Sequence, residues 1–270
     1  MSPEVVSSSP AMASTTRIIQ GPAGRLVVTD SGEGGLPVIF VNSNAGRREQ
    51  WAAQQAHLKQ RSVSFDLRGM GESDPDSQDR YGAKDMAEDV NAVADTLGLK
   101  RFVLVGHSFG GIVVGEYAIR WPERLAGLVF VDSSGTMPPL PPEQVAWFRD
   151  GMRPEKYRDF MDTWFAPILQ NAKPYTREAV MSWLHATPRE VVLSALQSIL
   201  TYDSDPVFER YKGPVHTLVA EAFIQPNAYH LLYPGTPHTV FTGVSHWLMM
   251  DKPEEFNAAL DAFLATLPQP

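Results

Sequence analysis

A pentapeptide at residues 106–110, Gly-His-Ser-Phe-Gly, lies between an apolar run and a helical pattern. Residues 102–105 have the composition of a buried strand, and residues 112–118 that of a helix. A sharp turn from strand to helix strains the backbone of its central residue, and flanking glycines avoid Cβ clashes there. The pattern therefore predicts a strand, a tight turn and a helix, with Ser108 as a nucleophile at the turn.

Alternating strand and helix patterns extend this unit over most of the chain. Residues 84–97 carry Met86, Val90 and Val93 on one helical stripe, and Gly98 is a natural end for that helix. Strands that alternate with helices predict a mostly parallel sheet covered on both faces. The other strand-like runs lie at residues 25–29, 38–41, 62–65, 128–131, 215–219 and 239–241, and a last amphipathic helix lies at residues 253–266.

A helical segment interrupts this alternation. Residues 138–142 contain four prolines, which neither a helix interior nor a central strand accommodates. Residues 143–205 are helix-like, rich in aromatic side chains, and have no strand pattern. We therefore expect a helical insert within an α/β sheet, and a flexible N-terminal tail over residues 1–15.

A serine hydroxyl becomes a good nucleophile only when a neighbouring base takes its proton. His246 is the best candidate, because it lies in a loop just after the last apolar run, at the end of a predicted strand. His107 is adjacent to Ser108, but neighbouring side chains at such a turn point apart. The histidines have no spacing typical of metal ligands, so we expect no metal site.

The composition excludes several classes of function. The net charge is −8, which argues against a nucleic-acid partner and against an anionic membrane surface. Cysteine is absent, so disulfides, a thiol nucleophile and zinc–thiolate sites are excluded. The N-terminus has neither a basic start with an apolar run nor a membrane-spanning stretch. We expect a cytoplasmic protein with no membrane partner.

Together, four motifs resemble those of the α/β-hydrolase superfamily, in its branch of small esterases, haloalkane dehalogenases and perhydrolases. The resemblance covers residues 25–268. It implies the α/β-hydrolase fold, with a core of residues 16–134 and 209–270 and a helical cap of residues 135–208. The motifs are residues 41–46 with Trp51, residues 66–73, residues 106–111, and residues 243–247 followed by 251–256.

The resemblance also implies the other members of the site. Backbone N–H groups of Asn44 and Phe109 correspond to the oxyanion donors of the family. The acid that orients His246 corresponds to Asp132, after the strand that follows the nucleophile helix, or to Glu221, in the loop after residues 215–219.

Two departures from the family pattern affect these assignments. Asn42-Ser43 stands where the family usually has His-Gly, so the Ser43 side chain can narrow the oxyanion loop. The loop that holds Glu221 lacks the aspartate that the family often carries there.

Serine at the turn fits acyl transfer, whereas the dehalogenases of this superfamily use aspartate there. We therefore predict a hydrolase of carboxylic esters or lactones that works through an acyl-enzyme on Ser108, without metal, flavin or nucleotide. A lyase or cofactor-independent oxygenase on the same fold and a non-catalytic ligand receptor remain as alternatives. The aromatic cap predicts a partly apolar small-molecule substrate. The candidate contacts, which could equally pack the cap, are Trp147, Trp164, Trp183 and Trp247.

Overall fold

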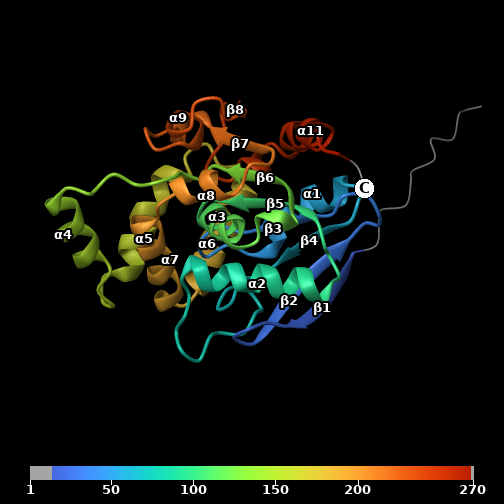
Figure 1. Cartoon of the computed structure of the whole chain (residues 1–270). Coiled ribbons are helices and arrows are strands. Elements are labelled where there is room, and N and C mark those ends of the chain that lie inside the picture. Colours follow the sequence, from blue (N-terminus) through green and yellow to red (C-terminus); the bar gives the residue numbers. More distant parts are fainter. Residues whose placement is uncertain (1–13, 269–270) are drawn as a thin grey trace, which may run out of the picture.

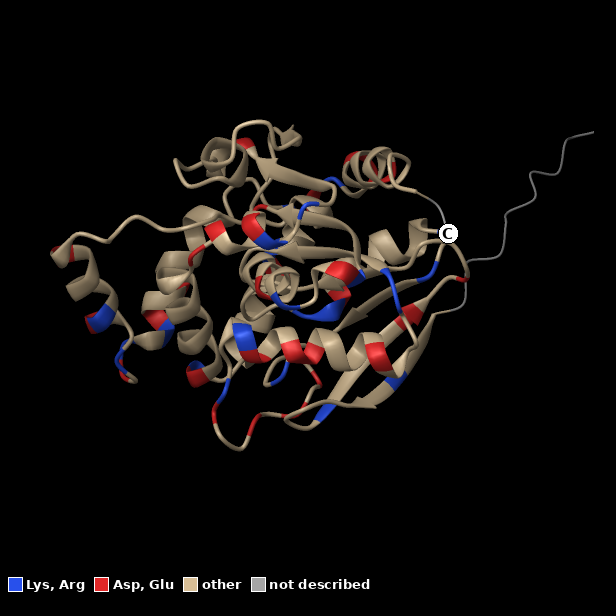
Figure 2. Cartoon of the chain, in the orientation of Figure 1, with Lys and Arg blue, Asp and Glu red and all other residues tan. Residues whose placement is uncertain are grey.

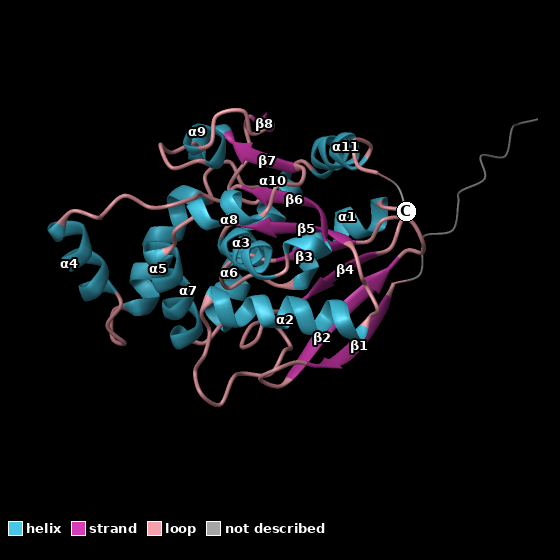
Figure 3. Cartoon of the chain, viewed as in Figure 1, coloured by secondary structure: helices cyan, strands magenta, loops and turns pink. Residues whose placement is uncertain are grey.

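An eight-stranded sheet forms the centre of the computed structural model, which describes residues 14–268 (Figure 1, Figure 3). Its strands are β1 (Thr15–Gln20), β2 (Arg25–Ser31), β3 (Val38–Val41), β4 (Ser62–Phe65), β5 (Phe102–His107), β6 (Leu125–Val131), β7 (Val215–Ala220) and β8 (His238–Phe241). Their order is β1-β2-β4-β3-β5-β6-β7-β8. The pairs β1–β2 and β2–β4 are antiparallel, and the other neighbours are parallel. The predicted α/β fold with a mostly parallel sheet is confirmed.

Strand β1 was not predicted from the sequence. It is the edge strand of the sheet and mostly exposed, so it carries no run of buried apolar residues that would mark it. The predicted tail over residues 1–15 lies almost wholly outside the described residues, and Thr15 is the first residue of β1.

Side chains of successive strand residues pack on opposite faces of the sheet. In β3, Ile39 and Val41 belong to one hydrophobic cluster, and Val38 and Phe40 belong to the other. The same alternation recurs in β5 and β6, where both faces are apolar. This explains why the central strands appear in the sequence as continuous apolar runs rather than as alternating patterns.

Helices cover both faces. α2 (Ala83–Thr96) and α3 (Phe109–Arg120) supply much of one cluster, and α11 (Pro253–Leu264) packs in the other with the residues around α1 (Ala52–His57). α3 begins directly after Ser108, three residues before the start that the sequence predicts.

A helical insert lies between β6 and β7, as predicted (Figure 1). It packs beside the ends of the central strands, with α4 at the outer edge of the molecule in this view. Helix α8 crosses the boundary at residue 208 that the sequence predicts for the cap. The helices of the insert are α4 (Pro142–Gly151), α5 (Tyr157–Ile168), α6 (Pro174–Ala186), α7 (Arg189–Thr201) and α8 (Asp205–Arg210).

In the view of Figure 2, Lys and Arg residues are interspersed with Asp and Glu residues along the helices and loops. Within residues 14–268, no helix has both the length and the apolarity needed to cross a bilayer.

A buried ion-pair network holds the turn after β4 against α2. The Arg68 guanidinium donates to Asp89 at 2.6 and 2.8 Å and to Asp76 at 3.0 Å, and all three side chains are almost fully buried. Burial raises the pKa of the Asp89 carboxyl, and the hydrogen bonds from Arg68 act in the opposite direction. Arg68 of the motif at residues 66–73 therefore has a structural role, because it holds the turn after β4 against α2.

Replacing Arg68 with Met should lower the free energy of unfolding by about 3–5 kcal/mol, because it leaves a buried carboxylate without its cation. Arg25→Met is the matched control, since it breaks the exposed ion pair with Asp74 and should change stability little. Urea denaturation followed by tryptophan fluorescence measures both variants. Equal losses in the two would contradict a special role for the buried network.

Candidate active site

Ser108 occupies the turn between β5 and α3 with φ +55° and ψ −120°, a conformation that non-glycine residues rarely adopt. The glycines beside it allow the close packing of this turn. A Cβ on Gly106 would lie 2.3 Å from the carbonyl oxygen of Gly110, and one on Gly110 would lie 2.5 Å from that of Asn42. The strained turn predicted from the sequence is therefore present, and its glycines are required by backbone contacts.

Two hydrogen bonds anchor this turn to the strand beside it. The N–H of Ser108 donates to the carbonyl of Val131 at 2.9 Å, and the Ser133 hydroxyl donates to the carbonyl of Ser108 at 2.8 Å. A Cβ on Gly111 would lie 2.2 Å from the Ser133 hydroxyl, so glycine is needed there as well. Sequence reasoning did not identify Ser133, because a serine after a strand has no distinctive pattern.

Asp132 follows β6 and faces His246. Its Oδ2 lies 2.6 Å from His246 Nδ1, and its Oδ1 accepts the N–H of Ala220 at 2.9 Å. Its own N–H donates to the carbonyl of Leu218 at 2.7 Å, and its φ is +41°. The carboxylate is therefore held by the backbone of β7. Because Nδ1 of His246 faces this carboxylate, it carries the proton, which leaves Nε2 with the free lone pair of a base.

The other candidate acid lies elsewhere. Glu221 follows β7 and is exposed, and within residues 14–268 it makes no hydrogen bond to His246. Phe223, two residues later, instead packs its ring against that of His246. Of the two carboxylates, the structure brings only Asp132 to the histidine.

A chain of buried polar contacts reaches the histidine from the loop after β3. The Ser43 hydroxyl lies 3.4 Å from Gln50 Oε1, Gln50 Nε2 donates to His107 Nδ1 at 3.2 Å, and His107 Nε2 donates to the carbonyl of His246 at 2.8 Å. His107 is fully buried. Burial and the nearby His246 ring hold the pKa of His107 well below its usual value, so its ring is neutral. The sequence argument considered His107 only as a base and missed this role of support.

Ser108 and His246 line the same cavity, whose volume is about 140 Å³. Within residues 14–268 no hydrogen bond joins the Ser108 hydroxyl to His246. In hydrolases this contact often shortens only in the complex with substrate. Asp132 and Phe109 also line this cavity, which we call the catalytic cavity.

The two predicted oxyanion donors follow neighbouring strands. β3 pairs with β5 through Val41 and Gly106, so the loop that carries Asn44 lies beside the turn that carries Ser108. Within the described residues, the backbone N–H groups of Asn44 and Phe109 have no hydrogen-bond partner. The N–H of Phe109 is also the first of α3, whose N-terminal end favours negative charge. The Asn44 side chain donates to the carbonyl of Val192 in α7.

The four candidate tryptophans lie in different surroundings. Trp164 lines an apolar cavity of about 860 Å³ within the insert, between α4, α5 and α7, which we call the apolar cavity. Trp247 is buried and packs against the rings of His246 and His107, whereas Trp147 is about half exposed on α4. Trp183 packs against the hydrophobic cluster on the α11 face. None of the four lines the catalytic cavity, so their contact with substrate stays a prediction.

Comparisons with known proteins identify the family of this chain. The family described as alpha/beta hydrolase fold matches residues 37–211. The chain belongs to the α/β-hydrolase fold family. The predicted resemblance is therefore confirmed, and the family implies a small-molecule substrate. No group of three or more His, Asp or Glu side chains within residues 14–268 is arranged to hold a metal ion.

Three relatives illustrate the range of this α/β-hydrolase family. A protein of Caulobacter vibrioides named "Putative carbamate hydrolase RutD" is 29% identical over 246 residues, which cover 85% of this chain and 91% of that protein. An esterase from Thermogutta terrifontis is 25% identical with a TM-score of 0.77, over 93% of this chain and 98% of that one. An enol-lactonase from Burkholderia xenovorans, at 20% identity and a TM-score of 0.79 over 92% of this chain and 100% of that one, shares the fold.

His107 should make the protein sensitive to acid. Its pKa is lowered in the folded state, so the unfolded chain binds the extra proton first, and stability falls as the pH drops below about 6.5. The loss has a slope of at most about 1.4 kcal/mol per pH unit for one group. Chemical denaturation of wild type and His107→Gln between pH 7.5 and 5 measures it. The variant should show the shallower dependence, and parallel curves would contradict the neutral assignment.

Proposed function

We propose that this α/β-hydrolase cleaves carboxylic esters or lactones through an acyl-enzyme formed on Ser108. One observation carries the proposal: the 2.6 Å contact of His246 Nδ1 with Asp132, in a cavity that Ser108 also lines. A strained serine, an imidazole and a buried carboxylate on separate loops of one sheet edge are the parts of a nucleophilic triad. The named carbamate hydrolase and esterase relatives are consistent with attack on a carbonyl carbon.

His246 Nε2 takes the proton from Ser108 as the oxygen attacks the carbonyl carbon. The Asp132 carboxylate stabilises the imidazolium that forms. The proton then passes to the leaving oxygen as the C–O bond breaks, which leaves the acyl group on Ser108. Water, deprotonated by His246, attacks the acyl-enzyme, releases the acid and restores the serine.

Negative charge develops on the carbonyl oxygen as Ser108 attacks, and hydrogen-bond donors that are already in position stabilise it. We assign this role to the backbone N–H groups of Asn44 and Phe109, which have no other partner within the described residues. The removal of one such donor typically reduces the rate about 10²–10³-fold. Ser43 stands where the family has glycine. Its hydroxyl is hydrogen-bonded to Gln50, so it does not occupy the backbone N–H groups of this loop.

The cavities favour a substrate with one apolar part. The catalytic cavity, at about 140 Å³, is smaller than the roughly 300–1,000 Å³ of typical ligand sites. Met137 and Ile199 line both this cavity and the apolar cavity of about 860 Å³. Phe148, Trp164 and Leu196 also line the larger one. We assign the apolar cavity to the acyl group, which agrees with a partly apolar substrate.

A panel of p-nitrophenyl acetate, butyrate and octanoate tests the proposal on wild type, Ser108→Ala, Asp132→Asn and Glu221→Gln. Ser108→Ala should lose acyl-enzyme turnover, and Asp132→Asn should lower kcat by roughly 10⁴, since the imidazole then adopts the wrong tautomer. Glu221→Gln makes the same chemical change at the exposed carboxylate and should behave as wild type. The butyrate or octanoate ester should be preferred to acetate by wild type.

Two results would contradict this account. Loss of activity in Glu221→Gln but not in Asp132→Asn would transfer the acid role to Glu221. Release of p-nitrophenol that survives in Ser108→Ala would contradict an acyl-enzyme on Ser108, because water would then attack the ester carbonyl directly.

A further inference from the structure

The motif at residues 251–256 has no part in the proposed mechanism, yet its first residue is a buried acid. Asp251 ends the short helix α10 (Leu248–Asp251) and is only 4% exposed. Its Oδ2 accepts the N–H and the hydroxyl of Ser245 at 2.8 and 2.5 Å, and its Oδ1 accepts the N–H of Lys173 at 2.9 Å. Within residues 14–268 it forms no ion pair, so these three neutral donors replace the water that the carboxylate loses on burial.

Ser245 immediately precedes the base His246, and Asp251 contacts the residues on both sides of that base. The Ser245 hydroxyl, which donates to Asp251, also accepts the N–H of Trp247 at 3.1 Å. The N–H of Asp251 in turn donates to the carbonyl of Trp247 at 3.1 Å. One carboxylate therefore fixes the backbone before and after the imidazole, whose ring is held by Asp132.

The histidine loop is also joined to the helical insert, at the connection between α5 and α6. The N–H of His246 donates to the carbonyl of Ile168, the last residue of α5, at 3.1 Å. Lys173, which directly precedes α6, donates its N–H to Asp251. Asp251 thus ties the histidine loop to the same segment of the insert that binds the N–H of the base.

Two other roles do not fit the contacts of Asp251. Helix α11 begins at Pro253, but within the described residues the Asp251 oxygens accept no N–H of α11, so Asp251 is not its cap. Asp251 does not line the catalytic cavity, so it is not placed to touch the substrate or to exchange a proton there. It acts instead on the position of His246, through Ser245 and Lys173.

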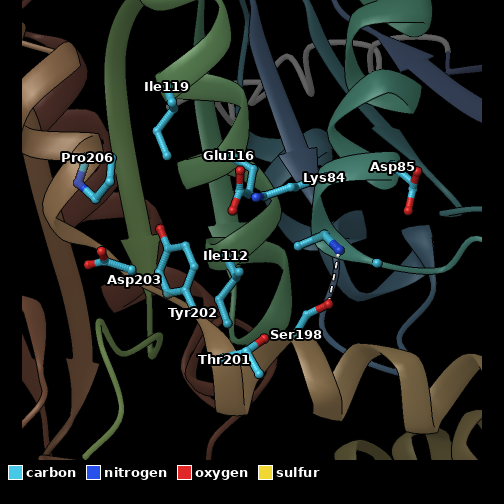
Figure 4. Close-up of a pocket in the computed structure, with 12 residues that line it drawn as sticks. Lys84, Asp85, Ile112, Glu116, Ile119, Ser198, Thr201, Tyr202, Asp203 and Pro206 are labelled. Carbon is cyan, nitrogen blue, oxygen red and sulfur yellow. Dashed lines mark hydrogen bonds between the residues drawn. The ribbon is translucent and has the colours of Figure 1, made fainter.

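The insert has another attachment to the core, which involves no residue of the histidine loop. The Ser198 hydroxyl of α7 accepts the N–H of Ala83, at the start of α2, at 3.2 Å (Figure 4). This contact lies beside a pocket of about 580 Å³ that none of the site residues predicted from the sequence lines. It joins the insert to the core as the Lys173 contact does, and it therefore provides a control for the contacts of Asp251.

We propose that Asp251 is a positioning residue for the catalytic base. Its carboxylate holds Ser245 and Trp247 against the insert, so that Nε2 of His246 stays within reach of Ser108 when the substrate binds. The proposal rests on the proposed function of Ser108 and adds a second carboxylate, which acts on the backbone of the base and not on its ring. Its effect is on the steps in which His246 moves a proton, and not on substrate binding.

Asp251→Asn tests this contact with little change in shape. Oδ1 faces the N–H of Lys173 and Oδ2 faces that of Ser245, so the amide nitrogen of asparagine opposes a donor on either side. For p-nitrophenyl butyrate, kcat and kcat/KM should both fall about 10–100-fold with KM within about twofold, which is the scale of a base displaced by about 1 Å. Asp89→Asn makes the same change at a buried carboxylate of the Arg68 network and should retain the wild-type kcat per folded molecule.

The dependence on the leaving group separates positioning from a loss of folded enzyme. The p-nitrophenolate ion leaves without a proton, whereas the alcohol of ethyl butyrate needs the proton that His246 carries. Asp251→Asn should therefore lower kcat/KM for ethyl butyrate about threefold or more beyond its effect on p-nitrophenyl butyrate. A smaller amount of folded protein would lower both by the same factor. A pH-stat follows the ethyl ester, and urea denaturation gives the folded fraction of each variant.

Ser245→Ala provides a second variant, which removes a single hydroxyl and tests the same contact if Asp251→Asn does not fold. It should lower kcat with little change in KM. In the double variant it should add little to the effect of Asp251→Asn, because both changes act on one contact. Ser198→Ala removes a hydroxyl from the other attachment of the insert and should retain the wild-type kcat.

Three results would overturn the inference and leave the proposed function standing. They are a wild-type kcat in Asp251→Asn or in Ser245→Ala, equal losses in Ser245→Ala and Ser198→Ala, and equal effects of Asp251→Asn on the ethyl and p-nitrophenyl esters. Failure of the wild-type protein to hydrolyse either ester, or a wild-type rate in Ser108→Ala, would overturn the proposed function and this inference with it.

Discussion

The hydrogen bond between His246 and Asp132 is the contact on which the chemistry of this site depends. Asp132 can hold the imidazole in one orientation because two backbone contacts fix its own position. Its Oδ1 accepts the N–H of Ala220, and its N–H donates to the carbonyl of Leu218. Asp132 and Ser108 both have a positive φ, which is a strained conformation for residues other than glycine. Hydrogen bonds to the neighbouring backbone hold them in it. The sheet thus supplies rigidity, and the loops at its edge supply the reacting groups.

A second set of contacts fixes the backbone of the histidine loop. Gln50 joins Ser43, next to the proposed oxyanion donor Asn44, to the buried His107, and His107 donates to the carbonyl of His246. The N–H of His246 donates to Ile168 at the end of α5. The base is therefore held from the core through His107 and from the insert through α5. Ser43, which stands where the family usually has glycine, therefore takes part in these buried contacts.

Much of the fold and the central residues could be predicted, because their signals are local. Ser108 is marked by the strand, glycines and helix around it, and His246 by its place after the last strand. The walls of the cavities could not be predicted, since Ile112 in α3, Met137 in the segment before α4 and Ile199 in α7 are brought together only by tertiary packing. Aromatic content predicts an apolar insert, but it does not distinguish Trp164, which lines a cavity, from Trp147, which is about half exposed to solvent.

The most direct test of the central claim is the identification of the residue that a fluorophosphonate probe modifies. Peptide mass spectrometry of the treated wild-type protein should find one phosphonyl group on Ser108, in proportion to the loss of esterase activity. A serine becomes this reactive only when a base accepts its proton, so the Ser108→Ala protein should remain unlabelled. Inactivation with the label on another residue, or full activity after complete modification of Ser108, would contradict the account.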